Sequence, residues 1–150
     1  MVDVVLHAVD ALSDDRPAFD VVVLLQPTSP LRTSGDIDRA IERLREPGVD
    51  GVVSVCPAEH SPLLAGELPE SGSPAEFLRP ADRVANRQEL PVFHRLNGAV
   101  YVARIAWLRA RRSFVGEGAF AYIMPSERSV DVDSELDLAL AECILARAEA

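Results

Sequence analysis

Two apolar runs constrain the fold of this chain more than any other feature. Residues 19–25 (FDVVVLL) and 51–56 (GVVSVC) are rich in β-branched side chains and too short for a core helix. Neither run alternates apolar with polar residues, as a strand with one face in water does. We therefore expect two strands buried on both faces, a pattern typical of parallel α/β sheets.

Helical patterns alternate with these runs. Thr33 and Asp36 have the spacing of a capping box and predict a helix that ends before Gly48. Ser134 and Asp137 predict a second capped helix near the end of the chain. The apolar stripes of the helices are Val5, Ala8, Val9 and Leu12 in residues 2–12, Ile37, Ile41 and Leu44 after the first cap, and Leu136, Leu140, Ile144 and Ala148 after the second.

The remaining segments complete an α/β pattern. Two more strands are expected at residues 97–103 and 121–124, with a short helix over residues 105–112 between them. The alternation indicates one domain over residues 1–150, a layered sheet with helices on both faces. An irregular insertion or dimerisation arm is expected at about 64–94, where prolines and charges are scattered. Ligands of such sheets bind in the loops at the carboxyl ends of strands.

Composition narrows the possible functions. A net charge of -9 opposes nucleic-acid binding, and the absence of lysine removes Schiff-base and P-loop lysine chemistry. No run approaches the roughly 18 apolar residues of a membrane span, and no signal-peptide pattern opens the chain, so we expect a cytoplasmic protein without a membrane partner. Cys56 and Cys143 lie among apolar neighbours, which predicts buried free thiols.

The loop after the first strand carries the first candidate site. Gln26 places an amide at the strand tip that can read the edge of a base, and Arg32 can pair with a phosphate or a carboxylate. Pro27 and Pro30 restrict the backbone between them. The alternative is a rigid turn that only leads into the capped helix.

A pair of carboxylates forms the second candidate site. Asp131 and Asp133 are two positions apart in what is expected to be extended backbone, so their side chains project to the same side. Two hard oxygen ligands suit Mg²⁺, which takes one or two protein carboxylates together with phosphates and water. A solvated strand edge before a helix cap is the alternative.

Five segments resemble one enzyme family. The run LLQPTSPLR at residues 24–32 is similar to a motif of the acylneuraminate cytidylyltransferase family, which includes CMP-sialic acid synthetases. Four further segments resemble family segments in the same order: residues 52–62, 87–91, 95–101 and 129–133. The resemblance implies a Rossmann-like nucleotidyltransferase sheet and a homodimer. It also implies transfer of CMP from CTP to an acidic nine-carbon sugar, a nonulosonic acid such as N-acetylneuraminate, with release of pyrophosphate.

The resemblance also implies roles for individual residues. Asn97 and Tyr101 would lie at the sugar site, and Arg87 would contact the acidic sugar or a phosphate, in this family sometimes across the subunit interface. The implied sets are nucleotide binding by Gln26, Thr28, Ser29 and Arg32, substrate binding by Arg87, Asn97 and Tyr101, and catalysis by Arg95, Asp131 and Asp133, the last two holding Mg²⁺.

One part of the resembled family has no counterpart in this sequence. Family members open with strands and a loop rich in glycine, arginine and lysine that cradles the triphosphate, so we expect a sheet with its N-terminal strands missing. Backbone N–H groups and cations of that loop surround the phosphate oxygens, and without them we expect weak or no turnover of CTP. The alternatives are a non-catalytic remnant that acts as a binding or dimerisation module, or a nucleotide-binding domain of another specificity.

Overall fold

The computed structural model describes residues 1–13, 19–73 and 90–148 of the chain. These residues form two compact units, one made of residues 1–56 and 96–150 and the other of residues 57–95. The predicted arm at about 64–94 falls within the range of the second unit, and its residues 74–89 lie outside the described part of the chain.

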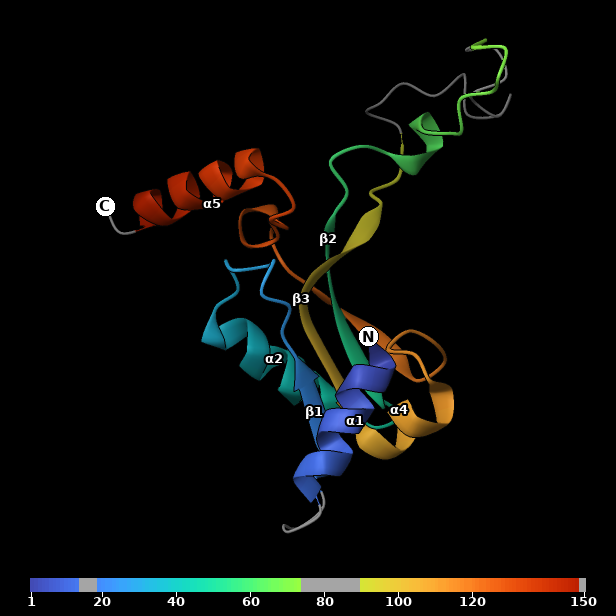
Figure 1. The fold of residues 1–150 in the computed structure, drawn as a ribbon, viewed down its shortest axis with the longest axis vertical. Coiled ribbons are helices and arrows are strands. Elements are labelled where there is room, and N and C mark those ends of the chain that lie inside the picture. Colours follow the sequence, from blue (N-terminus) through green and yellow to red (C-terminus); the bar gives the residue numbers. More distant parts are fainter. Residues whose placement is uncertain (14–18, 74–89, 149–150) are drawn as a thin grey trace. The chain divides into compact units, whose positions relative to one another are not determined.

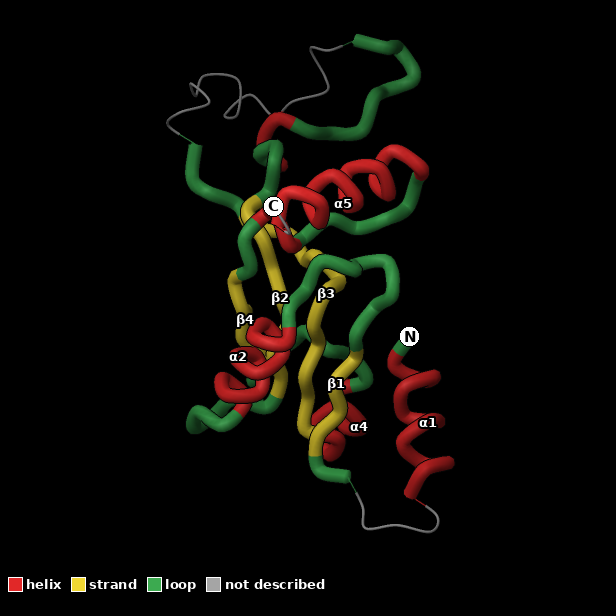
Figure 2. The backbone as a smooth tube through the Cα atoms, turned by 90° about the vertical axis from the view of Figure 1, so that its left-hand side faces the viewer, coloured by secondary structure: helices red, strands yellow, loops and turns green. Residues whose placement is uncertain are grey.

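A mixed four-stranded sheet forms the centre of the first unit, in the order β1-β3-β2-β4 (β1, β2 and β3 are labelled in Figure 1, all four strands in Figure 2). Its strands are β1 (Val21–Leu24), β2 (Gly51–Pro57), β3 (His94–Arg104) and β4 (Ala119–Ile123). Strand β2 runs parallel to β4, whereas β1 is antiparallel to β3, with Val21 opposite Arg104. The predicted α/β class is confirmed.

The burial of the two predicted core strands differs. All residues of β2 from Gly51 to Cys56 are buried, as expected, because β2 lies between β3 and β4. Strand β1 is only half-buried and Val21 is exposed, so the prediction of a strand buried on both faces is wrong there. The predicted parallel direction is also wrong for β1. A run of β-branched residues predicts a strand, but not its place or direction in the sheet.

Helices cover both faces of the sheet (Figure 2). Successive side chains of a strand point to opposite faces, and β3 shows this alternation plainly. Val100 and Val102 pack in one core cluster, which includes Ala40 and Leu44 of α2 (Ser34–Leu44). The other cluster contains Tyr101 and Ala103 of β3, Val5 and Leu6 of α1 (Val2–Ser13), and Leu108 of α4 (Ile105–Arg111).

Both predicted caps are present. The Thr33 hydroxyl accepts from the amide of Asp36, whose carboxylate accepts from the amide of Thr33, so α2 begins with a complete capping box. Ser134 and Asp137 make the same reciprocal bonds at the start of α5 (Glu135–Ala148). Two single turns of 3₁₀ helix, η1 (Pro62–Leu64) and η4 (Ser126–Arg128), complete the described helices.

Some apolar positions lie in solvent. Leu136 of α5 is 78% exposed and Leu140 is 50% exposed, although their spacing correctly predicts the helix. Cys143 is exposed as well, so its predicted burial is wrong, whereas Cys56 is buried, and both thiols are free. Helical spacing shows which residues share a face and does not supply a surface for that face to pack on.

None of the described helices combines the length and the apolar composition that a bilayer crossing requires.

Candidate functional site

The loop after β1 is closed by its own arginine. The amide of Ser29 donates to the carbonyl of Gln26 at 3.2 Å, forming a turn. Arg32 Nη1 donates to the carbonyls of Gln26 and Ser29 at 2.7 and 2.5 Å. One end of the Arg32 guanidinium therefore holds the loop in shape, and its predicted contact with a ligand stays a prediction.

A glycine on β3 makes room for the side chain of Gln26. Gly98 has a φ of +72°, in the left-handed region that side chains with a Cβ atom rarely adopt. A Cβ atom placed there would lie 2.5 Å from Gln26 Oε1 and 3.0 Å from Ser29 Oγ. The loop and β3 therefore approach each other closely at the predicted base-reading amide.

Asn97 connects three segments from inside the core. Its side chain is almost completely buried; Oδ1 accepts from Ser54 Oγ at 2.6 Å and Nδ2 donates to Ser129 Oγ at 2.8 Å. Its carbonyl accepts from Ser29 Oγ at 3.0 Å. The amide is thus engaged with β2 and with the segment before Asp131, so it shapes the site, and its predicted contact with a sugar stays a prediction.

A main-chain bond joins the two candidate sites that the sequence shows far apart. The amide of Val132 donates to the carbonyl of Thr28 at 2.7 Å. Thr28 itself is exposed, and Val132 stands between the two predicted metal-binding carboxylates. The structure therefore brings the loop of residues 26–32 against the Asp131 and Asp133 segment.

Asp131 is the less solvated of the two carboxylates. Its Oδ1 is buried without a hydrogen-bond partner among the described residues, whereas Asp133 is exposed. Tyr101 lies nearby: burial raises the pKa of its phenol, and the charge of Asp131 raises it further. Asp131 thus has a buried acceptor oxygen that no donor of the described residues matches, which is costly unless a cation or another donor satisfies it.

This oxygen fits a divalent cation. Mg²⁺ prefers hard oxygen ligands and keeps several waters, so one or two carboxylates are enough protein ligands. Within the described residues no group of three or more His, Cys, Asp and Glu side chains is arranged to hold a metal. Asp131 and Asp133 therefore suit a cation shared with a phosphate-bearing ligand better than a cation held by protein alone.

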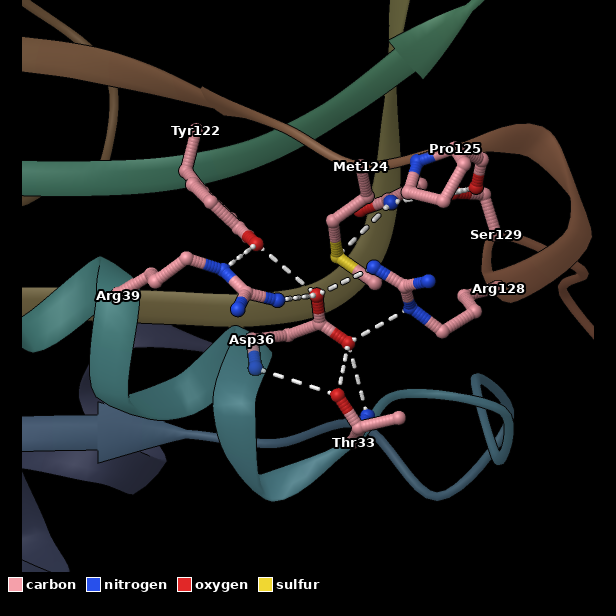
Figure 3. A network of polar contacts seen from close by, with 9 residues as sticks. Thr33, Asp36, Arg39, Tyr122, Met124, Pro125, Arg128 and Ser129 are labelled. Carbon is pink, nitrogen blue, oxygen red and sulfur yellow. Dashed lines mark hydrogen bonds and ion pairs between the residues drawn. The ribbon is translucent and has the colours of Figure 1, made fainter.

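A second buried carboxylate, Asp36, holds the neighbouring structure together (Figure 3). It is 0% exposed and accepts from side chains on different elements. Oδ2 accepts from Thr33 Oγ1 at 2.7 Å and from Arg128 Nε at 2.9 Å. Oδ1 accepts from Tyr122 OH at 2.9 Å, from Arg128 Nη2 at 3.0 Å and from Arg39 Nη2 at 3.1 Å.

These contacts keep Asp36 ionised. Burial by itself would raise the pKa of Asp36, but the hydrogen bonds from Arg128, Thr33 and Tyr122 hold it well below its usual range. The same carboxylate raises the pKa of Arg128 through their hydrogen bonds. The Asp36 and Arg128 pair is therefore charged at neutral pH.

One of the two other predicted arginines belongs to the second unit, and the other lies outside the described residues. Arg95 belongs to the second unit, where Nη2 and Nε bond the carboxylate of Glu59 at 3.0 and 3.2 Å. That pair borders a hollow of about 510 Å³, also lined by His60. Hydrogen bonding from Arg95 lowers the pKa of Glu59. Arg87 lies outside the described residues.

Sequence reasoning missed the polar residues that support the site. Asp36 was recognised only as a helix cap, and neither Arg128 nor Ser54 was singled out. Asp36 and Arg128 are 92 positions apart, so no local pattern connects them. The position of Arg128, just before the predicted metal-binding pair, is the one signal in the sequence that points to it.

Comparison with known proteins gives a consistent set of relatives. The chain is 37% identical to N-acylneuraminate cytidylyltransferase of Streptococcus agalactiae serotype V, over 85% of this chain and 30% of that protein. It is 32% identical to CMP-N,N'-diacetyllegionaminic acid synthase of Legionella pneumophila, over 85% of this chain and 54% of that protein.

A third relative matches a longer part of the chain. The chain is 29% identical to N-acylneuraminate cytidylyltransferase of Escherichia coli O18:K1:H7, over 90% of this chain and 31% of that protein. No family model matches the chain. The chain thus spans about a third to about half of the length of these relatives.

Proposed function

The chain belongs, over 85% of its length, to the acylneuraminate cytidylyltransferase family, and on that premise we propose that it contributes the nucleotide and metal site of an enzyme that makes CMP-activated nonulosonic acids. In this reaction a hydroxyl oxygen of the sugar acid bonds to the α-phosphorus of CTP. The bond from that phosphorus to the β-phosphate oxygen breaks, pyrophosphate leaves, and the hydroxyl proton passes to solvent.

The observation that carries the proposal is the bond between Val132 and Thr28. It joins the loop of Gln26 to the segment of Asp131 and Asp133 through main-chain atoms, 2.7 Å apart. A nucleotide whose base is read by Gln26 would then have its phosphates near the carboxylate pair. Transfer of a phosphorus group depends mainly on positioning and electrostatics, so residues that place the reactants matter more than a covalent nucleophile.

Each residue of this site has a physical role in the proposal. Gln26 offers both a donor and an acceptor to the edge of cytosine, and Gly98 leaves the space for it. Asp131 and Asp133 would hold Mg²⁺, which supplies neutralisation of charge on the triphosphate when bound. Because this chain has a net charge of -9, binding two anionic substrates requires such local compensation.

The direct test is formation of a CMP-sugar. The chain is joined to the N-terminal strands and triphosphate loop of one of the cytidylyltransferases that it resembles, because weak or no turnover is expected without them. This protein is incubated with CTP, Mg²⁺ and either N-acetylneuraminate or N,N'-diacetyllegionaminate, and pyrophosphate and CMP-sugar are quantified. Asp131→Asn should reduce the rate at least about a hundredfold, because it removes a metal ligand from the site. Glu127→Gln, which removes one exposed acid from the same segment, serves as the matched control and should leave the rate unchanged.

Two results would contradict the proposal. The first is no CMP-sugar from either acid under conditions where the protein is folded. The second is an Asp131→Asn variant as active as the parent.

We also propose that the chain forms a homodimer, which sedimentation velocity measures directly. A dimer that binds CTP without turnover would favour the alternative of a non-catalytic binding or dimerisation module. A monomer at all concentrations tested would overturn the dimer proposal.

A further inference from the structure

Asp36 has no part in the proposed reaction, yet the fold surrounds it with donors. Its carboxylate accepts from Thr33 at the end of the nucleotide loop, from Tyr122 on β4 and from Arg128 in η4. It also accepts from Arg39, one turn along its own helix. A buried carboxylate needs about this many hydrogen-bond donors to stay charged, so the donors around Asp36 satisfy its carboxylate fully.

Among the partners of Asp36, Arg128 is the one that lies in the segment just before the candidate metal site. Two of its nitrogens meet both oxygens of Asp36, at 2.9 and 3.0 Å, in the paired geometry that fixes an arginine in direction as well as distance (Figure 3). Its own amide donates to the carbonyl of Pro125 at 3.2 Å, and Ser129 Oγ donates to the same carbonyl at 2.8 Å. The turn of residues 125–129 is thereby closed and tied to α2.

The segment after this turn is held on both sides of Asp131. On one side are Arg128, through Asp36, and Ser129, whose Oγ accepts from Asn97 Nδ2; on the other is the bond from Val132 to Thr28. Asp131 lies between these anchors, with its buried Oδ1 unmatched by any donor of the described residues. The direction of its carboxylate therefore depends on the anchors on both sides, of which Arg128 is one.

We propose that Asp36, acting through Arg128, positions Asp131 and Asp133 to bind a divalent cation. The inference rests on the proposed function, because it supposes that those carboxylates hold the cation. Asp36 and Arg128 are positioning residues: they act through the turn of residues 125–129 and touch neither substrate in the proposal. Partners outside the ligand set orient metal ligands in this way in many proteins.

Charge alone does not account for the arrangement. Asp36 and Arg128 neutralise each other, so the pair adds little net field at Asp131. The two-point contact is the part that a lysine cannot reproduce, since its ammonium is a single point charge. Arg128→Lys thus keeps the positive charge and removes the two-point contact that fixes the direction of the side chain. Arg39→Gln is the matched control, because Arg39 also bonds Asp36 but belongs to α2 and does not hold the turn.

The experiment is a titration with Mn²⁺ alone, followed by amide NMR of the isotope-labelled protein. Mn²⁺ broadens signals close to where it binds, so the parent should lose the amides of residues 131–133 first. In Arg128→Gln the Mn²⁺ concentration for half-loss should rise about tenfold or more, as when such supporting partners are removed. In Arg128→Lys, which keeps the positive charge, it should rise less, about fivefold. Arg39→Gln should differ from the parent by less than about twofold.

Each possible result of the titration supports or contradicts the inference. If Arg128→Lys and Arg128→Gln bind Mn²⁺ as the parent does, Asp36 and Arg128 are only structural and the inference is wrong. Equal weakening by Arg39→Gln would show a general loss of stability and would also overturn it. If Arg128→Gln fails to fold, as judged by circular dichroism, the lysine variant decides alone. If the parent itself shows no localised loss at residues 131–133, the proposed metal site fails, and with it the proposed function.

Discussion

Gly98 and Gln26 lie so close that a methyl group at residue 98 would stand 2.5 Å from Gln26 Oε1. The contact couples the backbone of β3 to the side chain proposed to read the base. Gly98 is needed for two reasons, because the position combines a close approach to Gln26 with a φ of +72°.

Gly98→Ala should therefore weaken CTP binding as well as stability. The left-handed backbone costs about 1–2 kcal/mol for a residue with a Cβ atom, and the clash displaces Gln26. We expect CTP affinity to fall about tenfold, which corresponds to about 1.4 kcal/mol. Gly48→Ala is the control, because Gly48 has a φ of +79° and nothing within 4 Å of the added atom. Equal CTP affinity in the two variants by calorimetry would contradict the prediction.

Asn97→Ala should be among the more destabilising changes in the first unit. It removes the amide acceptor of the Ser54 hydroxyl and the amide donor to Ser129 Oγ in a buried site, where the loss of a hydrogen-bond partner costs about 1–3 kcal/mol. We expect a loss of about 3 kcal/mol in the free energy of unfolding, measured with urea. Ser29→Ala removes one donor to the Asn97 carbonyl and should cost about 1 kcal/mol. A cost for Asn97→Ala no larger than that of Ser29→Ala would count against the network.

The stability that Asp36 provides should depend on pH with a defined sign. Its pKa in the folded protein lies below the unfolded value of about 3.9, so the unfolded state binds the proton first as pH falls. The contribution is therefore complete above that value and declines as pH drops below it. The difference in unfolding free energy between the parent and Asp36→Asn should stay constant from about pH 5 to 8 at about 3–5 kcal/mol and shrink at lower pH. A difference that grows on acidification would have the wrong sign.

The two cysteines should react at very different rates. Cys143 is exposed, whereas Cys56 is fully buried in β2. An aromatic disulfide reagent should therefore modify one thiol quickly in the native protein and both thiols in denaturant, since reactivity requires access. Cys143→Ser should remove the fast phase and leave the slow one. Persistence of the fast phase in that variant would show that Cys56 is accessible.

Local sequence patterns predicted those parts of the fold that depend on neighbouring residues. The capping boxes at Thr33 and Ser134 were correct because their bonds span three positions. The burial of β2 was correct because a strand between two others is covered on both faces. The burial and direction of β1 were wrong because they depend on its place in the sheet, which its own residues do not encode.

In the candidate site, too, local motifs could be predicted from the sequence and long-range contacts could not. The loop from Gln26 and the pair of Asp131 and Asp133 were visible as motifs, and their contact through Val132 needed the fold. Asp36 was visible as a cap, whereas its bond to Arg128 crosses 92 positions. Long-range polar contacts arise when a fold brings separate elements together, so one sequence gives no spacing from which to infer them.

The bond between Val132 and Thr28 has a consequence for engineering. Both of its atoms belong to the main chain, so side-chain replacement at either position leaves the donor and the acceptor in place. Proline at residue 132 is the exception, because it has no N–H. A library aimed at new acceptor sugars can therefore vary residue 28, and residue 132 to any residue but proline, while the junction between nucleotide loop and carboxylate segment persists.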